Sequence, residues 1–171
     1  MSFFGKIILL VVLLGLSGCA NTATDETSNK TLEDQFSSPE FVTLETEQGV
    51  VVMLANPLLF PFDSDELTEE SQSPIAFIAR VLTTPGVLSR QVQINGYADS
   101  VGTEDYNLDL ARRRAESVAK ELVYNQVAAE RIEYFSYGEA NPVAPNVASD
   151  GSDNPQGRTL NRRVEIVILN P

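Results

Sequence analysis

The strongest pattern in the chain is the alternation of apolar and polar side chains that half-buried strands require. Over residues 91–97 this alternation places Val92, Ile94 and Gly96 on one face and polar residues on the other. Near the start of the folded part, two runs rich in apolar residues flank a turn at residues 47–49, which predicts a hairpin or a bent pair of strands. The predicted strands are 41–45, 50–54, 91–97, 132–137 and 164–169.

Apolar residues at helical spacing mark two helices between these strands. The first follows Ser73 and Pro74, a plausible cap and a proline at the first helical position, so that Pro74 argues against a helix starting at Thr68. The second helix carries the stripe Leu108, Ala111, Ala115, Val118 and Leu122. Because strands alternate with helices, the pattern predicts an α/β (α+β) sandwich, a sheet with helices packed on one face.

The N-terminus predicts a targeting segment. Lys6 precedes a short apolar run that suits the core of a signal peptide, and the run ends in LSGC. This tetrapeptide resembles the lipobox of bacterial lipoproteins, in which the cysteine is lipidated, so residues 1–18 are expected to be a lipoprotein signal peptide and Cys19 the lipidated residue. Ala20, by resemblance to known sorting behaviour, favours the outer membrane. The alternative is a secretory peptide in which the cysteine falls there by chance.

Polar residues dominate the segment that follows. Residues 20–40 are rich in Thr, Ser, Asn, Asp and Glu, with Leu32 and Phe36 as the sizeable apolar side chains. Such a stretch buries too little surface to offset its ordering entropy. We therefore expect residues 19–40 to be a lipidated N-terminus and flexible linker, and residues 41–171 to be the folded domain.

Composition narrows the function classes. The chain has 171 residues, 43% of them hydrophobic, which suits one domain with a real core. The chain has 12 basic and 24 acidic residues, and this negative net charge repels polyanions. No nucleic-acid partner is therefore expected. Histidine is absent, and the single cysteine excludes an internal disulfide or a cysteine cage for zinc. The sequence predicts neither a metal nor a cofactor.

Candidate chemistry follows the strand 91–97. Asp99 lies just past the strand, and Arg114 lies 15 residues later in the next helix. In α/β sheets, ligands commonly bind in the crevice beyond the carboxyl ends of strands. A carboxylate and a guanidinium in that crevice suit a zwitterion, because the first accepts hydrogen bonds from an ammonium and the second binds a carboxylate.

The segment GYADSVGTEDYNLDLARRRAESV, followed by RIEYFSYGEANPVAPN and NRRVEI, resembles the OmpA C-terminal-like family of peptidoglycan-binding domains, which includes the peptidoglycan-associated lipoproteins. The resemblance covers about residues 41 to 169. It implies a βαβαβ-type domain with a mixed β-sheet and helices on one face. Two positions depart from the commonest pattern, Tyr97 and Ala98, and the polar stretch SDGSDNPQ before Arg158 is extra.

The resemblance also implies a function and a set of ligand-binding residues. Family members bind the zwitterionic end of diaminopimelate in peptidoglycan stem peptides, with the position of Asp99 taking the ammonium and that of Arg114 the carboxylate. The expected function is non-enzymatic: a lipoprotein anchored in the outer membrane, with its domain in the periplasm, tethers that membrane to peptidoglycan. The remaining positions carried over from the family are Asn107, Phe62, Asp63 and Arg163.

Other interpretations remain open at this point. Asp99 and Arg114 can form a purely structural salt bridge. Asp99 with Glu104 or Asp105 can be a carboxylate pair for glycan hydrolysis, although a neighbouring arginine holds a carboxylate ionised and so suits binding better than proton donation. The protein can also be a scaffold for envelope proteins of a secretion, division or porin-associated complex. Three further arginines, Arg112, Arg113 and Arg162, are expected to pair with acidic residues.

Overall fold

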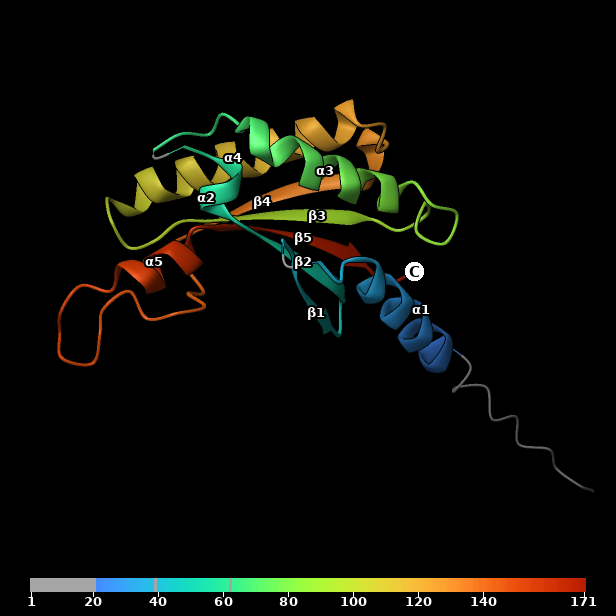
Figure 1. The fold of residues 1–171 in the computed structure, drawn as a ribbon, viewed down its shortest axis with the longest axis horizontal. Helices are drawn as coiled ribbons and strands as arrows, with labels where there is room; N and C mark the ends of the chain where they lie inside the picture. The colour runs from blue at the N-terminus through green and yellow to red at the C-terminus, as the bar shows by residue number, and fades with distance from the viewer. Residues whose placement is uncertain (1–20, 39, 62) are drawn as a thin grey trace, which may run out of the picture.

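The computed structural model describes residues 21–38, 40–61 and 63–171 (Figure 1). Within these residues, a five-stranded sheet has the order β1-β2-β5-β3-β4. Strands β3 and β4 are parallel and the other neighbours are antiparallel, so the predicted mixed sheet is confirmed. The strands are β1 (Val42–Thr46), β2 (Gly49–Ala55), β3 (Val92–Tyr97), β4 (Ile132–Gly138) and β5 (Arg163–Leu169).

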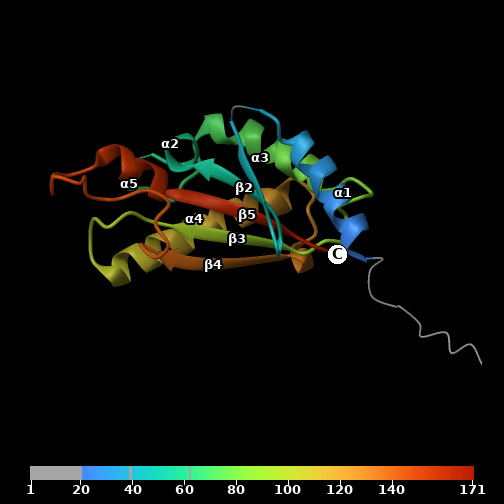
Figure 2. The same ribbon diagram turned by 90° about the horizontal axis from the view of Figure 1, so that it is seen from below.

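Two long helices, α3 (Glu69–Leu82) and α4 (Glu104–Tyr124), lie over one face of the sheet, as predicted (Figures 1 and 2). The core between sheet and helices contains alternate residues of the strands, among them Val52, Ile94 and Ile166. Short helical segments complete the described part of the chain: α2 (Asn56–Leu59), the 3₁₀ turn Ala129–Arg131 and α5 (Pro155–Asn161).

The second predicted helix is confirmed, with one difference in its buried stripe. Ala111, Ala115, Val118 and Leu122 are buried against the sheet, whereas Leu108 is exposed. Leu110 takes the buried place at this level of the helix. At the N-terminal end of α4, the buried face therefore includes Leu110 in place of the predicted Leu108.

Helix α3 begins earlier than predicted. Thr68 caps it, with the Thr68 hydroxyl accepting a hydrogen bond from the Ser71 N–H at 3.2 Å, and Pro74 lies inside the helix. The prediction that Pro74 argues against a helix starting at Thr68 is wrong. A proline inside a helix disturbs the carbonyl four residues earlier, which loses its N–H partner. That carbonyl belongs to Glu70, an exposed residue in the first turn, while the Pro74 ring is buried and adds to the apolar face.

The prediction of a flexible linker through residue 40 is wrong for its C-terminal part. Helix α1 (Asn21–Gln35) occupies this segment, and Leu32 and Phe36 are buried in the core. The Phe36 ring lies edge-on against Phe41 at 5.7 Å and Phe77 at 6.0 Å. Two apolar residues four positions apart share one face of a helix, so even this polar segment can pack where the domain offers an apolar groove.

Polar contacts also attach α1 to the domain. The buried Asn29 accepts a hydrogen bond from Arg90 Nη1 at 2.7 Å and donates one to Asn170 Oδ1 at 2.8 Å. Ser28 accepts a second hydrogen bond from the same guanidinium at 2.6 Å. These contacts join the N-terminal helix to the loop before β3 and to the end of β5, so residues 28–36 belong to the folded unit.

The predicted signal peptide and Cys19 lie outside the described residues. Within the residues described, every helix is too short or too polar to cross a bilayer.

Replacement of Phe36 by alanine tests the packing of α1. Because Phe36 is 1% exposed and contacts two other rings, Phe36→Ala is expected to lower the free energy of unfolding by about 3–5 kcal/mol in urea denaturation. Phe135→Ala, which removes a ring that is 40% exposed on β4, is the matched control and should change stability much less. Equal losses in the two variants would contradict a packed α1.

Candidate functional site

A cavity of about 540 Å³ lies where β3 ends and α4 begins. Its walls come from the segment after β3, from the first turns of α4, from the loop after α2 and from α5 with the residue that follows it. The volume falls within the usual range of small-molecule sites. The charged residues of the lining are Asp63, Asp99, Arg114, Arg158 and Arg162.

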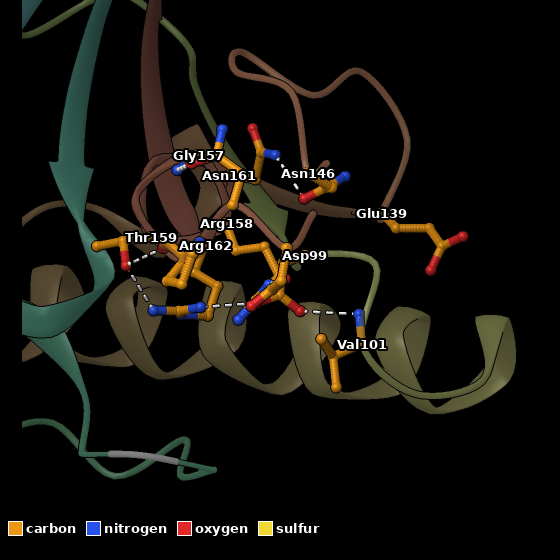
Figure 3. A network of polar contacts seen from close by, with 12 residues as sticks. Asp99, Val101, Glu139, Asn146, Gly157, Arg158, Thr159, Asn161 and Arg162 are labelled. Atoms are coloured by element: carbon orange, nitrogen blue, oxygen red, sulfur yellow. Dashed lines mark hydrogen bonds and ion pairs between the residues drawn. The ribbon is translucent and has the colours of Figure 1, made fainter. Parts of the chain in front are cut away.

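Asp99 is held in place by contacts to both of its carboxylate oxygens (Figure 3). Oδ1 accepts a hydrogen bond from the Val101 N–H at 3.0 Å, which closes the turn after β3. Oδ2 accepts one from Arg162 Nη1 at 2.6 Å, and Arg158 Nε lies 3.6 Å from the same oxygen. The carboxylate is therefore oriented by the turn and shared between two guanidinium groups.

Arg114 projects from α4 and is only 2% exposed. Its Nε donates to the Ser64 carbonyl at 2.9 Å, and its guanidinium carbon lies 5.3 Å from the centre of the Phe60 ring. Nη1 is buried and has no hydrogen-bond partner among the described residues. Burial, and secondly the positive charge of Arg162, lowers the pKa of Arg114 below its ordinary value.

Asn107 joins the strand end to the helix. Its Nδ2 donates to the Asp99 carbonyl at 3.0 Å and to Glu139 Oε2 at 2.9 Å. The helix begins at this level because the Thr103 hydroxyl accepts a hydrogen bond from the Tyr106 N–H and so caps α4. Asn107 therefore links the Asp99 backbone at the end of β3 to the Glu139 carboxylate.

The close approach of α4 to β3 depends on Gly96. A Cβ atom at this position would lie 2.1 Å from the Ala111 carbonyl oxygen and 3.3 Å from the Ala115 side chain. Only a residue without a side chain lets the helix backbone come this near to the strand. The contact fixes the distance between Asp99, at the end of β3, and Arg114, one turn beyond Ala111 on α4.

Asp63 lies on the rim of the cavity, and its backbone has a positive φ of 57°. Its Oδ1 accepts a hydrogen bond from the Tyr106 hydroxyl, and this bond raises the pKa of Tyr106. Asp63 therefore connects the loop after α2 with the start of α4. Phe62, the other predicted residue of this loop, lies outside the described residues.

The structure does not bring Arg163 to the cavity. Arg163 lies on β5 and faces away from the helices, where its Nε donates to Glu165 Oε1 at 2.7 Å and its guanidinium stacks 3.7 Å above the Tyr97 ring. The neighbouring Arg162 reaches the cavity instead, because successive residues at the start of a strand point in opposite directions. Asp99, Arg114, Asn107 and Asp63 are brought together as predicted.

Arg158 and Arg162 are the cavity residues that the sequence interpretation missed as site residues. Arg162 was expected to pair with an acidic residue, and it does so with Asp99. Arg158 also pairs with Asp153, which lies in the extra polar stretch. The NRRVEI motif was the available signal for Arg162, but Arg158 sits in a segment without helical periodicity.

Asn161 anchors the loop that carries these two arginines. Its Oδ1 accepts hydrogen bonds from the Val143 and Ala144 N–H groups at 2.9 and 3.0 Å. Its Nδ2 donates to the Ala144 carbonyl and to Asn146 Oδ1, the second of which is drawn in Figure 3. The first residue of the NRR motif therefore fixes α5 against the loop after β4.

The alternatives left open by the sequence can now be compared with this geometry. In the described part of the chain, Asp99 pairs with Arg162 and Arg158 rather than with Arg114, so a structural salt bridge between Asp99 and Arg114 is not formed. Glu104 and Asp105 are exposed at the start of α4 and do not line the cavity. The cavity thus does not assemble the carboxylate pairs considered for glycan hydrolysis.

The chain is similar to known proteins in both sequence and structure. A family model described as OmpA family matches residues 59–155. The Peptidoglycan-associated lipoprotein of Mesorhizobium japonicum is 31% identical over 137 residues, which cover 80% of this chain and 79% of that protein. Among solved structures, the cell wall anchor of the T6SS from Pseudomonas aeruginosa is similar with a TM-score of 0.66 and 27% identity, covering 83% of this chain and 96% of that chain.

Coverage of the relatives is uneven. Photosystem I P700 chlorophyll a apoprotein A2 of Gloeobacter violaceus is 38% identical over 129 residues, which cover 75% of this chain, but the chain spans only 15% of that protein's length. The similarity there is confined to one part of the larger protein.

Replacement of Gly96 by alanine tests whether the strand-to-helix contact builds the site. Gly96→Ala is expected to lower the free energy of unfolding by about 1–3 kcal/mol, because its Cβ collides with the Ala111 carbonyl. The control is Gly86→Ala, since a Cβ there would meet nothing within 4 Å. Thermal unfolding by circular dichroism measures both, and an unaffected Gly96→Ala variant would contradict the contact.

Proposed function

Because this chain belongs to the OmpA family, as its motifs predicted, we propose that its cavity binds peptidoglycan by the zwitterionic end of diaminopimelate in the stem peptide. One relative is named a peptidoglycan-associated lipoprotein and one similar structure is a cell wall anchor, and both names support this ligand. The function is non-covalent binding and not catalysis.

The observation that carries the proposal is the unpaired nitrogen of Arg114. A buried guanidinium N–H without a partner is uncommon in folded proteins, because leaving it unpaired costs about 1–3 kcal/mol. The rest of the guanidinium is fixed by Ser64 and Phe60, so its free edge is preorganised. A ligand carboxylate would satisfy this donor in a charge-assisted hydrogen bond.

Asp99 supplies the opposite charge for the ligand ammonium. Its carboxylate keeps acceptor capacity after the bonds from Val101 and Arg162, because two carboxylate oxygens offer about four lone-pair sites. The ammonium would join Arg162 and Arg158 around the same group. Binding therefore places positive charge among cations, and it requires the ligand carboxylate near Arg114 to offset that repulsion.

This requirement favours a zwitterion over a simple amine. The described cavity lining carries three guanidinium groups and two carboxylates, so a ligand with only a positive charge is disfavoured. A simple anion could satisfy Arg114 but would leave Asp99 without a ligand donor. Opposite charges on one small ligand satisfy both ends of the cavity.

We further propose that Cys19 is lipidated and anchors the domain to the outer membrane, which makes the protein a link between that membrane and the wall. The LSGC motif and the lipoprotein relative support this proposal. Because residues 28–36 pack on the domain, the flexible part of the link would be shorter than the predicted 19–40 segment. The domain would then sit close to the membrane, in the periplasm.

Co-sedimentation with purified sacculi tests the binding proposal. Asp99→Asn and Arg114→Gln should each lower the affinity for sacculi by about 10- to 100-fold. This is the loss expected when one charge-assisted hydrogen bond of about 1.5–3 kcal/mol is removed. Arg112→Gln is the matched control, because Arg112 lies on the exposed face of the same helix and pairs with Asp109 and Glu116. That variant should sediment like the native protein.

Circular dichroism separates loss of binding from loss of fold in these variants. If the folded Asp99→Asn and Arg114→Gln proteins still sedimented fully, the proposed contacts would be wrong. A native protein that stays in the supernatant would instead favour the envelope scaffold considered from the sequence.

Replacement of Cys19 by serine tests the anchor. Cys19→Ser is expected to move the protein from the membrane fraction to the soluble fraction, since acyl chains contribute about 0.8 kcal/mol for each buried CH₂. Asp99→Asn should remain in the membrane fraction, and Cys19→Ser should keep its binding to sacculi. A Cys19→Ser protein that stays in the membrane fraction would refute the lipid anchor.

A further inference from the structure

A second cavity, of about 480 Å³, lies on the face of the sheet opposite to α3 and α4. It shares no lining residue with the first cavity. Its floor is formed by Val51 and Val167, whose strand neighbours Val50, Val52, Ile166 and Ile168 point into the core. The remaining wall contains the aromatic and polar residues Asn95, Tyr97, Tyr137 and Glu165, with the turn between β1 and β2 at one side.

One wall of this cavity is a rigid aromatic stack. The rings of Tyr97 and Tyr137 lie 5.1 Å apart with an interplanar angle of 12°, and the guanidinium of Arg163 stacks on Tyr97 at 3.7 Å. Glu165 fixes that guanidinium through the 2.7 Å hydrogen bond to Nε. Tyr97 is buried, whereas Tyr137 is 37% exposed, so the stack presents Tyr137 as its accessible member.

A buried acceptor without a partner lies in the same cavity. Asn95 is only 7% exposed, and its Oδ1 has no hydrogen-bond partner within the described parts of the chain. An unsatisfied buried acceptor is destabilising, and such groups are rare in native proteins, so each one needs an explanation. The observation is independent of the aromatic stack and calls for a ligand that donates a hydrogen bond.

The other polar groups of the cavity favour a neutral ligand over an anionic one. Glu47 and Glu165 line it, and none of the described lining residues is a lysine or an arginine. Thr46, Gln48 and Asn141 offer neutral groups that both donate and accept. Burial, and secondly the charge of Glu165, raises the pKa of Tyr97, whose hydroxyl is hydrogen-bonded to Glu165.

From these observations we propose that the second cavity binds an N-acetylated amino sugar of a glycan chain. The apolar face of a sugar ring can stack on Tyr137, its amide N–H can donate to Asn95 Oδ1, and its hydroxyls match the neutral amide and hydroxyl groups of the rim. A neutral polyol also suits a described lining that contains two glutamates and neither lysine nor arginine. The cavity volume suits a ligand of one or two sugar rings.

This inference deepens the proposed function, on which it rests for the identity of the polymer, since peptidoglycan carries N-acetylated sugars beside its stem peptides. The first cavity would hold the peptide and the second the glycan. Two weak contacts with one polymer raise the overall affinity through effective concentration.

Isothermal titration calorimetry tests the proposal. The full chain in detergent is titrated with N,N′,N″-triacetylchitotriose, an N-acetylated oligosaccharide that contains no peptide. Saturable binding with a Kd of about 1 mM is expected. Tyr137→Ala should weaken it by at least about tenfold, while Tyr137→Phe, which keeps the ring, should retain it. Tyr124→Ala is the matched control, because Tyr124 is 78% exposed at the end of α4 and should leave the titration unchanged.

The Asp99→Asn variant distinguishes sugar binding in the second cavity from peptide binding in the first. The sugar should bind this variant as it binds the native protein, even where binding to sacculi is weakened. Absence of heat with the native protein, or equal affinity in Tyr137→Ala, would overturn the sugar site and leave the peptide site unaffected. Binding of a free stem tetrapeptide that is lost in Tyr137→Ala would also overturn it, because the cavity would then be a peptide site.

Discussion

The position of α4 against β3 is the constraint on which the functional site depends. The helix backbone approaches the strand so closely at Gly96 that a methyl group there would collide with the Ala111 carbonyl. Asp99 leaves the strand three residues later, and Arg114 lies one helical turn beyond Ala111. A carboxylate and a guanidinium from distant positions in the chain therefore face one cavity at a distance set by backbone packing.

The two charged residues Asp99 and Arg114 differ in how fully other groups of the cavity pair with them. Asp99 is already held by Arg162 and Arg158, whereas Arg114 has a buried nitrogen without a partner among the described residues. The segment from the extra polar stretch to α5 supplies both partners of Asp99, and Asn161 fixes that segment. The extra polar stretch is connected to the site in the same way, because its Asp153 forms an ion pair with Arg158 beside Asp99.

The two faces of the sheet have different chemistry because β5 alternates strictly. Val164, Ile166 and Ile168 enter the core, while Arg163 and Glu165 lie on the other side and organise the tyrosine stack. The same alternation explains why Arg162 and Arg163, adjacent in the motif, lie on opposite sides of the sheet: Arg162 lines the first cavity, and Arg163 stacks on Tyr97. A side chain at one of these positions cannot replace the other without a shift of register.

The sequence by itself determined the strands, the helix α4 and the placement of Asp99 and Arg114 at one cavity, because periodicity and the order of elements fix which residues share a face or a strand end. Only the tertiary structure decided the rest. Two apolar residues, Leu32 and Phe36, are too few to form a helical pattern that predicts a packed helix. The contacts that hold α1 come from Arg90 and Asn170, which are far away in the chain. Pro74 lies inside α3 because its buried ring and the N-terminal cap outweigh one lost hydrogen bond. Which of two adjacent arginines reaches Asp99 depends on where β5 begins, and that register comes from pairing with β2 and β3, a contact between distant segments that no local pattern contains.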